Sequence, residues 1–150
     1  MSYRTIKYCD FKYKNDKAFH DFISKNVFFA FSDKQFKEGL EKFNIKEEEV
    51  ADKLYRHFGG GYVLKSAVEE EKQILKRQHR IQNKYLNNFK NLVDALEYEM
   101  NNHECGYTGN YSEGLYALGF SRKDLENNKR LCKAYVIARK RVWEWYVKHN

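Results

Sequence analysis

Apolar and aromatic side chains recur every three or four residues through the middle of the chain. The stripe, which includes one glutamine, consists of Ile74, Gln78, Ile81, Tyr85, Phe89, Leu92, Leu96 and Met100. This spacing is typical of one face of an α-helix, and it persists for about seven turns at about 3.6 residues per turn. Ser66 with Glu69 forms a capping box at its start, and Asn87-Asn88 is a place where the helix can bend. The pattern therefore predicts a long central helix.

Two short apolar runs and several weaker helical patterns flank this helix. The runs at Val27–Phe31 and Tyr62–Leu64 are typical of buried strands, and their similar lengths allow them to pair. A two-stranded ribbon is marginal alone, so it must rest on the helices. Further helices are predicted at residues 15–25, 33–43, 47–58, 110–118 and 131–146. The expected fold class is α+β and mostly helical, with a long central helix and a C-terminal helix packed against short helices and a small two-stranded β element.

Length and composition limit the architecture further. The chain has 150 residues, no proline, 11 Phe and 12 Tyr, which fits a single domain, residues 1–150, with an aromatic core. The longest apolar run is far too short for a membrane span, and the N-terminus lacks the apolar core of a signal peptide. Three cysteines fit neither a disulfide framework nor a zinc ribbon. We therefore expect a soluble cytoplasmic protein with reduced thiols and no membrane partner.

Charge is unevenly distributed along the sequence. Residues 65–90 carry a formal charge of +4 and residues 120–150 carry +6, whereas residues 91–119 carry −5, within an overall charge of +7. Such basic bands favour a polyanionic partner, with nucleic acid or a ribonucleoprotein as the first candidate. On the long helix, four cations approach one face at helical spacing, namely Lys72, Lys76, Arg80 and Lys84, and Arg77 flanks that face.

The predicted C-terminal helix adds further cations and the two tryptophans. The cations singled out there are Arg139, Lys140 and Arg141. We predict that Trp143 lies in the core and that Trp145 is exposed and available to stack on a base. Together, the two basic helices predict a surface for a nucleic acid or an RNA-containing partner.

A polar decapeptide, Asn101–Asn110, lies inside the acidic stretch. His103 and Glu104 resemble the start of a metalloprotease helix, but Tyr107 stands where the second histidine belongs, so no metal or catalytic residue is predicted. The favoured interpretation is local: polar side chains satisfy backbone groups where the long helix ends, with Gly106 and Gly109 at positive φ. The alternative is a binding loop formed by His103, Glu104, Tyr107 and Thr108.

Three sequence blocks together resemble a family of small proteins encoded by bacteriophages and bacterial mobile elements. The blocks are Phe28–Gly39, Gly59–Ser66, and Asn102–Asn110 followed by Leu115, Ala117, Leu118 and Gly119. They span about residues 27–120 and leave out the basic C-terminal helix. The chain departs from the family at Cys105, where an aromatic or aliphatic residue is usual, and at Asn110, where Asp is frequent. The family supplies no catalytic residues.

Within that group the chain resembles anti-CRISPR proteins. The resemblance implies a stoichiometric inhibitor of a bacterial CRISPR–Cas effector, in particular a type VI effector that targets RNA. Its basic helices would contact the effector, its guide RNA or its RNA channel, without chemistry, cofactor or small-molecule substrate. Two alternatives stay open. One is a nucleic-acid-binding accessory or regulatory protein of a phage, and the other is a small nuclease using Glu104 and His103.

Overall fold

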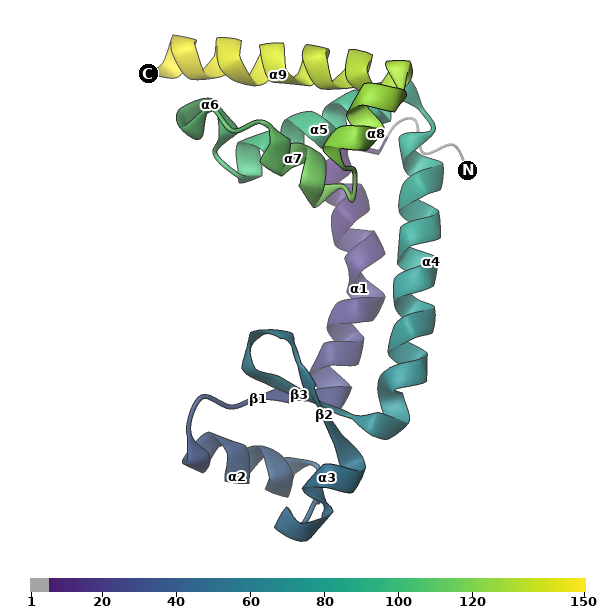
Figure 1. Cartoon of the computed structure of the whole chain (residues 1–150), viewed down its shortest axis with the longest axis vertical. Helices are drawn as coiled ribbons and strands as arrows, with labels where there is room; N and C mark the ends of the chain where they lie inside the picture. The colour runs from purple at the N-terminus through teal and green to yellow at the C-terminus, as the bar shows by residue number, and fades with distance from the viewer. Residues whose placement is uncertain (1–5) are drawn as a thin grey trace. The chain divides into compact units, whose positions relative to one another are not determined.

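The computed structural model describes residues 6–150, which are mostly helical with one small antiparallel sheet (Figure 1). The α-helices are α1 (Tyr8–Asn26), α2 (Asp33–Lys42), α3 (Val50–Lys53), α4 (Val68–Leu86), α5 (Phe89–Asn102), α6 (Cys105–Thr108), α7 (Ser112–Ala117), α8 (Arg122–Asn127) and α9 (Lys129–His149). The strands are β1 (Val27–Phe29), β2 (Leu54–His57) and β3 (Gly61–Leu64). Short 3-10 turns precede α3, β3 and α4, at Glu47–Glu49, Phe58–Gly60 and Lys65–Ala67. The predicted fold class, mostly helical α+β, is confirmed.

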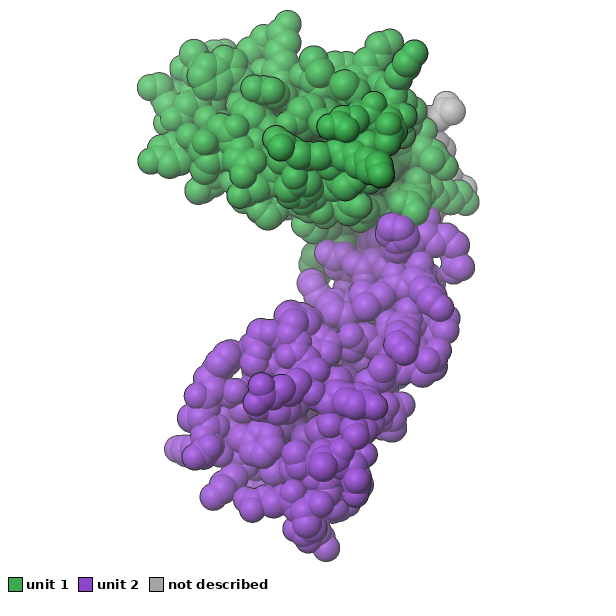
Figure 2. Space-filling model, viewed as in Figure 1, with its two compact units in different colours: residues 1–14, 81–150 green, residues 15–80 purple. Residues whose placement is uncertain are grey.

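The chain divides into two compact units (Figure 2). Unit 1 is Met1–Lys14, described from residue 6 on, together with Ile81–Asn150, and unit 2 is Asn15–Arg80. Helix α1 therefore begins in unit 1 and ends in unit 2, and α4 begins in unit 2 and ends in unit 1. Each unit has hydrophobic clusters of its own. The single domain expected from chain length stays a prediction.

Unit 1 is built around α5. Leu96 and Met100 are fully buried in a cluster to which α7 and α9 also contribute. The first turn of α1 joins this core through Phe11, whose ring stacks on Tyr85 at a centroid distance of 4.0 Å. In α7, a Cβ at Gly114 would lie 2.9 Å from the backbone nitrogen of Met100, so only glycine permits this close approach of the two helices.

Unit 2 contains the sheet, with strand order β1-β3-β2 and Val27 opposite Val63. Successive side chains of a strand point to opposite faces. Val27 and Val63 are buried with Phe22 of α1, whereas Phe28 is buried with Leu40 of α2. The sheet is therefore covered on both faces, and the predicted pairing of its two strand segments is confirmed.

The long helix expected from the apolar stripe is two helices. Helix α4 ends at Leu86, and α5 begins at Phe89 with Asn88 as its N-cap, whose side chain accepts a hydrogen bond from the Asn91 N–H at 3.1 Å. The buried Asn91 side chain in turn donates to the Tyr85 carbonyl at 3.1 Å. Because these side chains compete with the helical hydrogen bonds, the bend allowed for at Asn87-Asn88 is a complete break.

The predicted helix at residues 47–58 is wrong in its second half. Val50, Leu54 and Phe58 recur every four residues and so mimic a helical face, yet β2 begins at Leu54. Its four residues pair with β3, which occupies the middle of the sheet and therefore needs a partner on each side. Long-range pairing overrides the local pattern here. The β element consequently has three strands.

Within residues 6–150, no helix combines the length and the apolar character that a membrane span needs.

All three cysteines are free. Cys9 and Cys132 are exposed, and Cys105 is buried. Burial raises the pKa of the Cys105 thiol, which therefore stays protonated at neutral pH.

Candidate functional site

Helix α4 has a contact face and a solvent face. Asn15 of α1 donates to the Gln78 carbonyl at 3.0 Å, and Gln78 donates to Asp16, so this side of α4 lies against α1. Ile74, at the same helical position, packs against the cluster of Phe22 and its neighbours. At about 100° per residue, Lys72, Lys76 and Arg80 fall on the opposite side of the helix, and Arg77 flanks them. Because one side of α4 packs against α1, the side that carries the cations remains in solvent.

Three cations on that solvent face, with the flanking Arg77, form what we call the α4 ridge, made up of Lys72, Lys76, Arg77 and Arg80 of unit 2. All four side chains are exposed, and within residues 6–150 none of them forms an ion pair. Lys72, Lys76 and Arg80 follow one another at about 6 Å along the helix axis, given a rise of about 1.5 Å per residue. The fifth predicted cation, Lys84, is also exposed and belongs to unit 1.

Helix α9 likewise has two faces. Its inner face is buried in unit 1, through Leu131, Ala134, Ala138 and Val142. Its outer face carries Val136, Arg139, Lys140, Trp143 and Val147, all of them exposed. The outer face therefore combines cations with apolar and aromatic surface.

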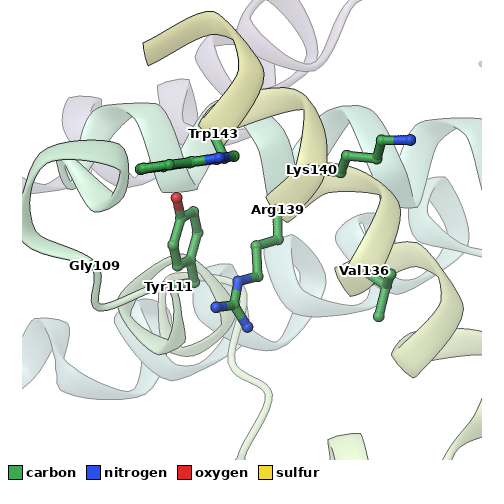
Figure 3. A pocket seen from close by; sticks show the side chains of 6 residues that line it. All are labelled: Gly109, Tyr111, Val136, Arg139, Lys140 and Trp143. Atoms are coloured by element: carbon green, nitrogen blue, oxygen red, sulfur yellow. The ribbon is translucent and has the colours of Figure 1, made fainter. Parts of the chain in front are cut away.

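A pocket of about 530 Å³ opens on this outer face (Figure 3). Its lining residues are Gly109, Tyr111, Val136, Arg139, Lys140 and Trp143. The Arg139 guanidinium carbon lies 4.9 Å from the centre of the Tyr111 ring, a cation–π contact that holds the cation at the pocket wall. Burial raises the pKa of Tyr111, so its hydroxyl is neutral at pH 7.

One prediction for α9 needs correction. Trp143, expected in the core, is 52 % exposed. Large apolar side chains favour a buried face that includes Trp143, whereas the residues that are buried on α9 include the small Ala134 and Ala138, and Trp143 lies outside this stripe. Arg141 is exposed, and its guanidinium lies 3.6 Å from Asp94 and 3.4 Å from Glu97 of α5, so its predicted role in binding a partner stays a prediction.

Trp145 and Lys140, two other residues predicted to bind a partner, are exposed on α9. Trp145 is 57 % exposed, as predicted, and its ring stacks on His149 at a centroid distance of 4.2 Å. Lys140 lines the pocket and lies 3.8 Å from the Glu144 carboxylate one turn away. Both are solvent-exposed, so this pair holds Lys140 only weakly.

The decapeptide Asn101–Asn110 is largely helical and does not form one continuous loop. Its first two residues end α5, and residues 105–108 form α6. Gly109 has a φ of 76°, as expected, but Gly106 is helical, and its missing side chain makes room for Tyr146, whose Cβ would lie 3.0 Å from an added Cβ. The left-handed residue besides Gly109 is Glu104, with a φ of 54°. Only Gly109 therefore has the positive φ predicted for the two glycines.

The four residues of the predicted binding loop lie at the end of α5 and in or next to α6. Thr108 Oγ1 accepts a hydrogen bond from the Asn110 N–H at 3.2 Å, a local role of the kind expected. Glu104 and Tyr107 are exposed, and His103 caps α5. Within residues 6–150, no three His, Cys, Asp or Glu side chains gather as metal ligands would. The binding role of these four positions stays a prediction.

Sequence reasoning missed a buried charge network next to His103. Glu99 is 1 % exposed, and its Oε1 accepts hydrogen bonds from Lys12 Nζ at 2.7 Å and from the Tyr8 hydroxyl at 3.2 Å. Its second oxygen, Oε2, lies 3.7 Å from His103 Nε2. The signal was present, because Glu99 stands three residues after Leu96, within the apolar stripe of α5. A glutamate in such a position needs a buried partner.

Lys12→Ala should lower the free energy of unfolding by about 2–3 kcal/mol, because it leaves the Glu99 carboxylate buried without its cation. This is less than the about 3–5 kcal/mol typical of fully buried pairs, since Lys12 is partly exposed. Chemical denaturation measures the change, with Lys14→Ala, at an exposed position of the same helix, as the control. Identical unfolding curves for the two variants would show that the pair does not stabilise unit 1.

Comparison with known proteins places the chain in a family. It belongs to a family of unknown function (DUF7659), which matches residues 7–141 and so includes the whole α4 ridge and most of the pocket lining. Trp143 and Trp145 lie beyond the matched residues. The comparisons with curated proteins and with solved structures gave no match.

Proposed function

We propose that this chain is a non-catalytic protein that binds RNA, or a partner containing RNA, through the α4 ridge. The observation that carries the proposal is the set of four exposed cations within nine residues of one helix, none of which is paired with a carboxylate within residues 6–150. Lysine and arginine on a rigid helix neutralise phosphates and release their counterions, which is the main source of affinity for a polyanion.

Some cations elsewhere in the described residues lie within 4 Å of a carboxylate, among them Lys12, Lys53 and Arg141. The pair of Lys12 involves the buried Glu99, whereas the other two pairs are exposed and weak. The charge of the ridge is available to a partner, and the spacing of its cations along one rigid helix is what favours this surface.

The resemblance to anti-CRISPR proteins supports a particular form of this function. In that form the chain is encoded by a phage or mobile element and inhibits a CRISPR–Cas effector in the cytoplasm of the bacterial host. A type VI effector is the specific expectation, since such an effector holds a guide RNA. The ridge binds the guide RNA or occupies the channel that holds this RNA. Inhibition is stoichiometric because binding alone blocks the effector.

The test compares two ligands, a type VI effector loaded with its guide RNA and the guide RNA alone. We expect nanomolar binding to the loaded effector, weaker binding to free RNA, and inhibition of target cleavage that saturates at about one chain per effector. Equal affinity for free RNA with undiminished cleavage would favour a nucleic-acid-binding accessory protein over an inhibitor. Failure to bind either ligand would contradict the proposed function.

A further inference from the structure

The pocket on the outer face of α9 brings together two kinds of surface (Figure 3). Trp143 contributes a large aromatic side chain, and Val136 and Tyr111 extend the apolar wall. Arg139 and Lys140 also line the pocket. In Figure 3 the Arg139 guanidinium lies beside Tyr111, whereas the Lys140 side chain extends away from Tyr111 and Trp143, so Arg139 supplies the positive charge of the pocket. A ligand that satisfies both surfaces must be flat and apolar in one part and anionic in another.

Arg139 is well placed to bind an anion. The cation–π contact with the Tyr111 ring holds the guanidinium in place. The N–H groups at the edge of the guanidinium remain able to donate hydrogen bonds to an anion. Within the described residues it forms no ion pair, and the one carboxylate paired with Lys140 is that of Glu144 at 3.8 Å. The pocket thus has at least one cation that no carboxylate compensates.

Trp143 is equally suited to stacking. One neighbour of its indole is Tyr146, at a ring-centroid distance of 6.1 Å and an interplanar angle of 29°, yet half of the side chain remains exposed. Figure 3 shows the Tyr111 hydroxyl directed toward the Trp143 ring from the floor of the pocket. At about 530 Å³, the pocket is within the size range of small-molecule sites, which is about 300–1,000 Å³.

We infer that this pocket binds a nucleotide, with the base stacked on Trp143 and the phosphate at Arg139. A nucleotide combines the flat π-face and the negative charge that the two surfaces require. The inference rests on the proposed function, since a nucleotide of a bound RNA strand is one source of this ligand and a free mononucleotide is the other. Stacking on an aromatic side chain is tolerant of sequence, so the pocket adds affinity more than base specificity.

Fluorescence of single-tryptophan variants tests the pocket directly. The chain has two tryptophans, so W145F leaves Trp143 as the reporter and W143F leaves Trp145. Adenosine monophosphate should quench the tryptophan fluorescence of W145F and leave that of W143F unchanged. Inorganic phosphate and adenosine each supply only part of the contacts. Each should therefore quench W145F only at concentrations about tenfold higher or more. Arg139→Gln in the W145F background should weaken the monophosphate by about tenfold and leave adenosine unchanged.

Two results would overturn the inference: no quenching of W145F by the monophosphate, or equal quenching of both variants. A short oligoadenylate that binds W145F at least tenfold more tightly than the monophosphate identifies an RNA strand as the source. Equal affinities identify a free nucleotide, which also supports the pocket. The mononucleotide does not need the α4 ridge, so a ridge variant that still bound RNA normally would contradict the proposed function and leave the pocket result intact.

Discussion

Leu96→Ala should lower the free energy of unfolding by about 2–5 kcal/mol, the range for truncating a fully buried leucine. Leu96 lies on α5 in the centre of unit 1 and has no exposed surface. The substitution removes apolar surface that α7 and α9 cover, and it leaves a cavity that the helices cannot close completely. Chemical denaturation followed by circular dichroism measures the change.

Leu75→Ala is the matched control, because it removes the same atoms from a leucine that is 42 % exposed on α4. Exposed positions usually change the free energy of unfolding by no more than about 0.5 kcal/mol, and partial burial adds modestly to this. Equal losses for the two variants would mean that α5 is not the central packing element of unit 1.

Replacing all four ridge residues with alanine should weaken RNA binding by about two to three orders of magnitude at about 0.1 M salt. The variant is Lys72→Ala, Lys76→Ala, Arg77→Ala and Arg80→Ala. The estimate assumes one phosphate per cation, each contributing about 0.7 to the slope of log K on log salt for a single strand. Fluorescence anisotropy of labelled single-stranded RNA measures the affinity, and the melting temperature should stay close to wild type because the side chains are exposed.

A second quadruple variant separates the ridge from net charge alone. Lys17, Lys25, Lys34 and Lys37 are exposed lysines of unit 2 outside α4, and their replacement by alanine also lowers the formal charge from +7 to +3. This variant should lose far less affinity than the ridge variant. Similar losses would show that binding depends on overall charge and not on one helix face.

The sequence predicts those parts of the fold where local pattern and packing agree. The stripe through Leu92, Leu96 and Met100 identifies α5 because its period matches the buried face of the helix. The break at Asn87-Asn88 is only partly visible, because the capping role of Asn88 depends on where the next helix begins. Strand β2 cannot be predicted locally, since pairing with β3 determines its conformation.

The same distinction applies to the candidate site. The ridge follows from helical spacing alone, so the sequence identified its cations. The pocket forms where Tyr111 lies beside the outer face of α9. These two parts of the chain come together only in the folded unit. Trp143 was misplaced because Ala134 and Ala138, small side chains that add little to an apolar pattern, form the buried stripe. The Glu99 network required Lys12, which is far away in sequence.

The salt dependence of RNA binding tests the role of the ridge most directly. For wild type, log K for single-stranded RNA should fall with log salt at a slope of about −3 or steeper, since four phosphate contacts contribute about 0.7 each. The four-residue ridge variant should flatten that slope by about 3, and the control with four other lysines removed should keep the wild-type slope within about one contact. A ridge variant with the wild-type slope would contradict the claim that these four cations bind phosphates.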